Sequence, residues 1–243
     1  MKRVLDIVVS GAGLLVTSPV LLLAAFAVWL QDRHSPLYIA DRVGKGEVNF
    51  RMVKMRSMVK NAAKTGVTST SDADLRITQV GRLIRKLKLD EVTQLINVLI
   101  GDMSLVGPRP NVMKWGVELY TEEEKRLLSV RPGITDFASV VFADEGHILS
   151  RESDPDLAYN QKIRPWKSRL SLFHIDHGSL WLDIKVVLYT VVSIVSRATA
   201  LRLVAGELRR LGAPEQLVEV ASRRDLLTAY PPPGSTEIAT LER

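Results

Sequence analysis

The chain has 243 residues, of which 46% are hydrophobic and 25% charged, so it is long enough for one sizeable folded domain. It contains no cysteine, which excludes disulfides, a thiolate nucleophile and cysteine-ligated zinc or iron–sulfur clusters. The net charge is +6, and residues 33–88 hold 13 Lys or Arg against four Asp or Glu. Such a basic segment favours polyanionic partners (nucleic acid, anionic lipid or phosphorylated metabolites), with a solvated basic face as the alternative.

Residues 11–30 carry no charge and are mostly apolar, and about 20 such residues suffice to cross a bilayer as a helix. Ser18-Pro19 lies near the middle of this run, where proline removes a backbone donor and predicts a kink. Three interpretations compete: a spanning helix, a re-entrant helix and a cleaved signal peptide. The signal peptide is disfavoured because Asp6 lies in its basic region and the apolar run continues past Ala25-Phe26-Ala27. Basic residues flank both ends, so the positive-inside rule does not choose between the other two.

The segment after the apolar run predicts a small β-hairpin. Residues 35–39 and 49–53 are short extended pieces, and the Gly-containing stretch 42–46 is typical of the turn between them. We expect a helix over 54–64 and a polar loop over 65–74.

Two apolar series at helical spacing follow, one from Val80 to Leu87 and one from Val92 to Leu99, and they are out of phase by one residue. A break near residues 88–90 explains the shift and makes Asp90 and Glu91 the first turn of the second helix. Gly101 is expected to end that helix, and residues 106–110, with two prolines, predict an irregular loop.

The remaining chain predicts an amphipathic helix over 118–130, a strand over 134–142 and an apolar helix over 180–195 that lies along a membrane interface. From residue 198 the composition indicates an appended helix and then a flexible, proline-containing tail. We therefore divide the chain into a membrane helix (1–32), a central domain (33–197) and a C-terminal extension (198–243).

The Asp90-Glu91 pair is the best candidate for chemistry. Acidic residues at a helix start are often only structural, because the helix dipole favours them there. Here Arg82 and Arg85 precede the pair and the loop with Arg109 follows it. A carboxylate that attacks phosphorus must be ionised, and cations or Mg²⁺ must mask the charge of its target. Magnesium takes one or two carboxylates and completes its shell with phosphate and water, so this pair can hold it.

Other chemistries are poorly supplied. The sequence has no P-loop, no GxGxxG after a strand and no GxSxG elbow. His174 and His177 lack an HExxH or carboxylate-rich context, which disfavours a metal site there. Aromatic residues do not interleave with the basic ones, which disfavours binding of nucleic acid by stacking.

Several short motifs follow one another along the chain. They are Lys2-Arg3 with Asp6, Ser18-Pro19, Arg42-Val43-Gly44, Lys54–Met58, Leu89-Asp90-Glu91, Gln94, Asn97-Val98-Leu99, Gly101–Pro110 (GDMSLVGPRP) and Arg131–Thr135. Together they resemble the bacterial sugar transferases, the small monotopic polyprenyl-phosphate phosphoglycosyl transferases. Gly101–Pro110 is the most specific of the motifs, and the likeness covers about residues 1–195.

The resemblance implies transfer of sugar 1-phosphate from a UDP-sugar to polyprenyl (undecaprenyl) phosphate, with release of UMP, as the first step of surface-glycan synthesis. It implies that Asp90 is the nucleophile of a covalent phosphosugar intermediate and that Mg²⁺ is required, with Asp90 and Glu91 as its ligands. It also implies a re-entrant N-terminal helix broken at Ser18-Pro19. Both ends of that helix, and the catalytic domain, then face the cytoplasm at the bacterial inner membrane.

The fold class expected is α+β and mostly helical: a re-entrant membrane helix and interfacial amphipathic helices around a small catalytic domain with a short hairpin. Five cations are candidates for binding phosphate or UMP: Lys54, Arg56, Arg85, Arg109 and Arg131. Arg109 is the strongest, because flanking prolines hold it and its guanidinium suits bidentate phosphate contacts.

Two departures from the family pattern leave helix entry and substrate choice open. The family's Ser-Leu-Asp-Glu-Leu-Pro-Gln is KLDEVTQ here, with Lys88 and Thr93, and its Gly-Trp-Ala-Gln is DFAS, with Asp136 and Ser139. A non-catalytic membrane scaffold that binds anionic lipid is the alternative function, and a membrane-tethered nucleic-acid binder is a weaker one. Residues after Ala198 are a candidate element for homo-oligomer formation.

Overall fold

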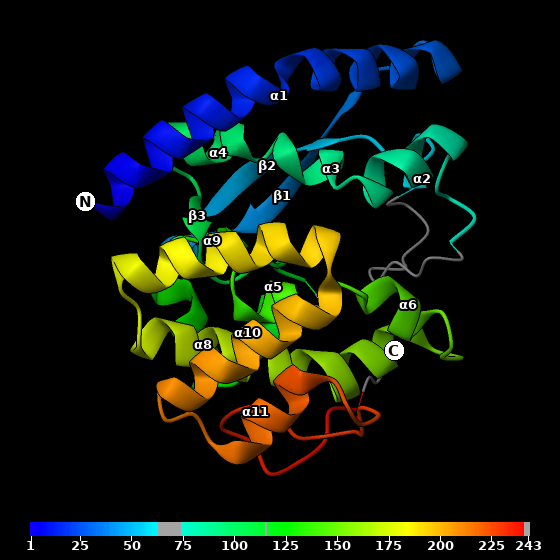
Figure 1. The fold of residues 1–243 in the computed structure, drawn as a ribbon. Coiled ribbons are helices and arrows are strands. Elements are labelled where there is room, and N and C mark those ends of the chain that lie inside the picture. The colour runs from blue at the N-terminus through cyan, green and yellow to red at the C-terminus, as the bar shows by residue number, and fades with distance from the viewer. Residues whose placement is uncertain (63–73, 115, 241–243) are drawn as a thin grey trace.

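The computed structural model describes residues 1–62, 74–114 and 116–240. In Figure 1 the long helix α1 crosses one end of the molecule, α2–α4 and the β1–β2 hairpin lie beneath it, and α5 and α8–α11 form a helical layer on the far side of that hairpin. The helices and strands are α1 (Lys2–Asp32), β1 (Leu37–Val43), η1 (Lys45–Glu47), β2 (Asn49–Met55), α2 (Gln79–Lys86), α3 (Leu89–Val92), α4 (Leu95–Ile100), β3 (Ser104–Val106), η3 (Val117–Leu119), η4 (Glu124–Ser129), β4 (Gly133–Thr135), α5 (Phe137–Val141), α6 (Glu145–Leu149), α7 (Pro155–Ala158), η5 (Tyr159–Ile163), α8 (Arg164–Asp176), α9 (Leu180–Val195), α10 (Arg197–Arg210) and α11 (Glu215–Ser222).

Helix α1 is continuous, with Pro19 inside it, and Figure 1 shows that it bends part-way along. Pro19 has no N–H to donate to the carbonyl oxygen of Leu15, four residues earlier. The hydroxyl of Ser18 donates to that oxygen instead, at 2.8 Å. The helix break expected at Ser18-Pro19 is therefore a bend inside one helix, because a side chain supplies the missing donor.

Both ends of α1 are bonded to the same globular body. Near the N-terminus, Lys2 Nζ lies 2.7 Å from Asp183 Oδ2, and buried Asp6 accepts hydrogen bonds from Ser104 Oγ and Leu105 N. At the other end, Arg56 makes a bidentate ion pair with Asp32, at 2.5 and 2.7 Å. Polar contacts thus anchor α1 at both ends, through Lys2 and Asp6 at one end and Asp32 at the other.

Much of α1 between these attachments is exposed and apolar. Among the described residues it is the helix long and apolar enough to cross a membrane, and only 6% of its most apolar window is buried. Exposed apolar side chains also cover one face of α9, which has the bounds expected from the sequence; they are Trp181, Leu188, Val191, Ile194 and Val195.

The predicted hairpin is confirmed. Strands β1 and β2 are antiparallel, with Leu37 opposite Met55 and Val43 opposite Asn49, and Gly46 at φ 66° makes the turn. The helix expected over 54–64 is wrong for the described residues up to 62. There the chain finishes β2 and then runs irregularly, because Arg56 N donates to the carbonyl oxygen of Pro36 and residue 58 bridges to residue 77. The loop expected over 65–74 lies, except for its last residue, outside the described residues.

The phase break between the two apolar series is also confirmed. Helix α2 ends at Lys86, Lys88 adopts a left-handed conformation at φ 57°, and α3 starts at Leu89 with both acidic residues in its first turn. Helix α4 ends at Ile100 and is capped by Gly101, whose φ of 102° suits glycine. Asn97 fixes α4 against β2, because its amide accepts from Val53 N and donates to the carbonyl oxygen of Arg51, both at 2.8 Å.

The loop at 107–110 is held by a close crossing of two chain segments. Strands β3 and β4 pair in parallel, Gly107 N donates to Thr135 O, and Gly133 N donates to Pro108 O. A Cβ on Gly133 would lie 2.1 Å from the nitrogen of Gly107, so glycine is required for this approach.

Two further expectations are wrong. Residues 118–130 form the short 3₁₀ segments η3 and η4 with turns between them, because the side chain of Glu124 is buried and accepts from Thr121 N and from Arg164. The strand expected over 134–142 ends at residue 135. Asp136 then caps α5 by accepting a hydrogen bond from Ser139 N, and the chain becomes helical.

The C-terminal extension is integrated into the core. Ala200, Val204 and Leu208 of α10 and Val218 of α11 are completely buried in the same cluster as α5, α8 and α9. The expected flexible tail is corrected: Tyr230 packs on Trp166, with ring centroids 4.4 Å apart, and the following residues bond to neighbouring segments of the body as far as Ala239. The buried residues of α10 form one broad face, and this face packs against α5, α9 and α11, so the helix is part of the core.

Candidate active site

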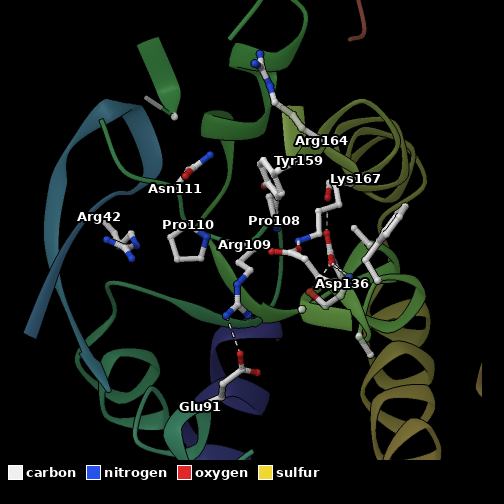
Figure 2. Close-up of a pocket in the computed structure, with 18 of the residues that line it drawn as sticks. Arg42, Glu91, Pro108, Arg109, Pro110, Asn111, Asp136, Tyr159, Arg164 and Lys167 are labelled. Atoms are coloured by element: carbon white, nitrogen blue, oxygen red, sulfur yellow. Dashed lines mark hydrogen bonds and ion pairs between the residues drawn. The ribbon is translucent and has the colours of Figure 1, made fainter. Parts of the chain in front are cut away.

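A cavity of about 760 Å³ lies between β2, α3, the loop 108–111 and helices α5, α6 and α8. Figure 2 shows side chains from these separate elements turned towards it, with Arg109 in the middle. One wall is rich in cations and holds the acidic pair, and the other is formed by polar residues of α5, α6, η5 and α8. A cavity of this size accommodates a nucleotide-sized ligand.

Asp90 and Glu91, in the first turn of α3, both line the cavity. Thr93 is buried beneath them and its hydroxyl contacts the carbonyl oxygens of Val53 and Asp90, which fixes α3 on β2. The departures at Lys88 and Thr93 therefore preserve the helix entry by other means: a left-handed residue before the helix and a hydroxyl tie inside it.

The pKa values of the two carboxylates are shifted in opposite directions. Burial raises the pKa of Asp90, and the neighbouring Glu91 raises it further. Burial also raises the pKa of Glu91, but Arg109, Lys54 and Lys88 outweigh it and hold that pKa at about 2. Among the described residues, Asp90 Oδ1 is buried without a hydrogen-bond partner. Within the described part of the chain, Asp90 thus has one carboxylate oxygen without a partner, beside the firmly ionised Glu91.

Arg109 is presented by the proline-flanked loop and bonds to Glu91, with Nη2 2.7 Å from Oε1. Glu91 raises the pKa of Arg109, so the guanidinium stays charged. The crossing of Gly107 and Gly133 fixes the backbone on the N-terminal side of this arginine.

Lys54 of β2 lies on the same wall. Burial and the nearby Arg109 lower the pKa of its ammonium to about 8, while Glu91 and Asp90 oppose that effect. Arg85 of α2 also lines the cavity and acts electrostatically on Asp90. The cavity therefore brings together five of the predicted residues, namely Lys54, Arg85, Asp90, Glu91 and Arg109.

Two predicted phosphate-binding residues do not line this cavity. Arg56 is paired with Asp32 at the end of α1. Arg131 donates from Nε to the carbonyl oxygen of Gly101 at 2.9 Å. Both arginines belong to motifs of the sequence, but in the fold each binds a partner outside the cavity.

Sequence reasoning missed several residues that line the cavity. Arg42 comes from β1, and only the folded structure shows that it lines the same cavity as the acidic pair. Glu145, Tyr159 and Lys167 come from three separate elements and carried no motif. Of the departures at 136–139, Asp136 is buried and bonds to Ser139 and Ser171, and Ser139 reaches the cavity.

The cavity offers two adjacent carboxylates, Asp90 and Glu91, as ligands for magnesium. The described residues contain no group of three or more His, Cys, Asp or Glu side chains that could hold a metal ion. Mg²⁺ needs only one or two carboxylates when phosphates and water complete its shell. Asp90 has an unpartnered oxygen and Glu91 has a second oxygen beside its arginine, so the pair fits that requirement. His174, in contrast, is buried against Asp183 and away from the cavity.

Comparisons with known proteins agree over most of the chain. The sequence pattern of the family described as "Bacterial sugar transferase" matches residues 1–197. A UDP-N-acetylgalactosamine-undecaprenyl-phosphate N-acetylgalactosaminephosphotransferase of Aeromonas hydrophila is 35% identical over 81% of this chain and 44% of its own length. A UDP-glucose:undecaprenyl-phosphate glucose-1-phosphate transferase of Caulobacter vibrioides is 34% identical over 82% of this chain and 71% of its own. An undecaprenyl-phosphate glucose phosphotransferase of Komagataeibacter xylinus is 36% identical over 78% of this chain and 35% of its own length. The matched region is thus less than half of two of these relatives.

Proposed function

The chain belongs to the bacterial sugar transferase family, and on that premise we propose that it transfers sugar 1-phosphate from a UDP-sugar to undecaprenyl phosphate and releases UMP. Its relatives are named for such reactions, and the cavity has the charges that this chemistry needs. The proposal includes the start of surface-glycan assembly, since the product is a lipid-linked sugar.

The observation that carries the proposal is the unpartnered, buried oxygen of Asp90 beside a wall of cations. We propose that this carboxylate attacks the β-phosphorus of the UDP-sugar. The bond from that phosphorus to the bridging oxygen breaks, UMP leaves, and a phosphosugar remains bonded to Asp90. An oxygen of undecaprenyl phosphate then attacks the same phosphorus, which forms the diphosphate product and frees the Asp90 carboxylate.

The other residues of this wall stabilise charge. A substrate that carries two phosphates needs compensating cations, and Lys54, Arg85 and Arg109 supply them. Glu91 orients Arg109 through their ion pair. Asp90 and Glu91 would together hold Mg²⁺, which when bound neutralises phosphate charge and makes UMP a better leaving group.

The attachment of both ends of α1 to one body supports a monotopic arrangement. We propose that the exposed middle of α1 enters the cytoplasmic leaflet of the bacterial inner membrane and returns. The catalytic cavity then faces the cytoplasm, where UDP-sugars are made, while the lipid phosphate reaches it from the membrane surface. A non-catalytic scaffold would not require an unpartnered carboxylate beside phosphate-binding cations, so this alternative is not favoured.

The test is UMP release by the full chain in detergent or nanodiscs with Mg²⁺, undecaprenyl phosphate and a panel of UDP-sugars. Asp90→Asn keeps the size of the side chain and removes the nucleophile, so UMP release should fall by about 10⁴-fold or more. Without the lipid acceptor, wild-type protein should retain radiolabelled sugar phosphate and Asp90→Asn should not. Unchanged UMP release by Asp90→Asn would show that Asp90 is not the nucleophile.

A further inference from the structure

The relatives named above act on different sugars, so family membership does not determine which sugar this chain transfers. The cavity has a second wall that the phosphate chemistry does not use. Three of its residues, Glu145 of α6, Tyr159 of η5 and Lys167 of α8, form a group that we call the polar wall.

The polar wall is held together by an ion pair. Lys167 Nζ donates to Glu145 Oε2, and the ammonium lies 5.5 Å from the centre of the Tyr159 ring. The side chains of Lys167 and Glu145 remain 17% and 29% exposed, so both reach the cavity and neither is sealed in the core. Glu145 keeps a second oxygen and Lys167 keeps further protons with which they can bond a ligand.

The position of this group is set relative to the phosphate-binding wall. In Figure 2 Tyr159 and Lys167 lie on the opposite side of Arg109 from Glu91. The diphosphate of a UDP-sugar joins the sugar at one end to the uridine at the other. If the diphosphate lies at Arg109 and Asp90, one of these two groups can therefore extend to the polar wall. Ser139 of α5, one of the departures from the family pattern, also lines the cavity.

The polar wall differs in charge from the phosphate-binding wall on the other side of the cavity. The wall of Lys54, Arg85 and Arg109 has excess positive charge and suits phosphate. The Glu145–Lys167 pair has no net charge and offers an acceptor and a donor side by side, with an aromatic face next to them. That combination matches adjacent hydroxyl groups and the apolar ring face of a sugar.

We propose that Glu145, Tyr159 and Lys167 form the sugar subsite of this enzyme and that they select an uncharged sugar. The inference rests on the proposed transfer from a UDP-sugar. The carboxylate of a uronic acid would lie beside the carboxylate of Glu145 and be repelled by it, and the charge of Lys167 is already engaged by Glu145, so acidic sugars are rejected. A site that bonds sugar hydroxyls discriminates strongly, because a missing or repelled group leaves its own polar atoms unpaired.

The test compares UDP-glucose, UDP-N-acetylgalactosamine, UDP-N-acetylglucosamine and UDP-glucuronate as donors, and measures the binding of UDP, which has both phosphates but no sugar. The key variant is the double substitution Glu145→Gln/Lys167→Met, which removes the ion pair without changing the net charge. Replacement of a partly buried pair as a unit is tolerated far better than loss of one partner. The control is Glu122→Gln/Lys125→Gln, which removes an exposed ion pair of the same kind.

We expect wild-type protein to use at least one uncharged sugar and to use UDP-glucuronate at least 100-fold less well in kcat/KM. In the Glu145→Gln/Lys167→Met variant this preference should fall by 10-fold or more, while the affinity for UDP stays within about 3-fold and the control variant matches wild type. The inference is overturned if the preference is unchanged, or if UDP and UDP-sugar affinities fall together with the melting temperature, since the pair is then only structural. If wild-type protein releases UMP from none of the donors, the proposed function itself fails.

Discussion

Arg109→Gln should remove the cation that keeps Glu91 ionised and should thereby change how stability depends on pH. Arg109 is the strongest of the cations that hold the pKa of Glu91 at about 2, against an ordinary value of 4.5, while burial acts in the opposite direction. The gap between these two values corresponds to about 3 kcal/mol. The Arg109 side chain is 38% exposed, so solvent screening reduces the expected difference to about 1–2 kcal/mol.

The lowered pKa of Glu91 determines how the free energy of unfolding changes with pH. Because the pKa of Glu91 is lower in the folded protein than in the unfolded chain, its contribution is complete above about pH 4.5 and disappears as the pH falls towards 2. The free energy of unfolding of wild type should therefore exceed that of Arg109→Gln by about 1–2 kcal/mol near pH 6. This difference should shrink as the pH approaches about 3, because Glu91 is then protonated in the unfolded chain and must lose its proton on folding to pair with Arg109.

The measurement is denaturant unfolding in detergent, with EDTA and no nucleotide, at steps from about pH 3 to about pH 7. Arg131→Gln is the matched control: it removes an equal charge from an arginine that bonds to Gly101 and lies outside the cavity. In the activity assay, Arg109→Gln should lower kcat/KM by about 10²–10³-fold and Arg131→Gln by less than about 3-fold. A stability difference that does not vary with pH, or an equal response of Arg131→Gln, would refute the reasoning.

Three further predictions concern the cavity, the core and the membrane helix. As the pH rises, kcat/KM should increase as Asp90 ionises, at a pH above the ordinary Asp pKa of 3.8, and should decrease above about pH 8 as Lys54 loses its proton. Lys54→Arg should move this alkaline decrease to higher pH. An alkaline decrease that stays at the same pH in Lys54→Arg would contradict the role of Lys54. A chain that ends at residue 197 lacks α10 and α11, so it should lose cooperative thermal unfolding; an active, cooperatively unfolding truncation would show that these helices are dispensable. Because the chain has no cysteine, one added before Met1 and one at Ser35→Cys should both react with a membrane-impermeant thiol reagent only from the cytoplasmic side; reaction from opposite sides would exclude a re-entrant α1.

Features that depend on neighbouring residues were predictable from the sequence. The hairpin turn needs a glycine at positive φ, and Gly46 supplies it. The break before Asp90 was visible as a phase shift of one residue between two apolar series, because a helix repeats every 3.6 residues. The acidic pair at the helix start and the rigid loop at Arg109 followed from the same local rules, and both line the cavity.

Where the sequence misled, a partner distant in the chain decided the outcome. The residues after Lys54 resembled a helix but belong to a paired strand and its bridge. The C-terminal residues resembled a flexible tail, yet their packing on α8 is visible only when Trp166 and Tyr230 are placed together.

The sequence by itself determined the family, the acidic pair and the local framework that carries it, since these are written in short motifs with fixed spacing. Only the tertiary structure decided which of the predicted cations share the cavity with Asp90: Lys54, Arg85 and Arg109 do, while Arg56 is bound by Asp32. It alone also placed Glu145 beside Lys167, because residues 22 positions apart on different helices meet through packing, which no local pattern records.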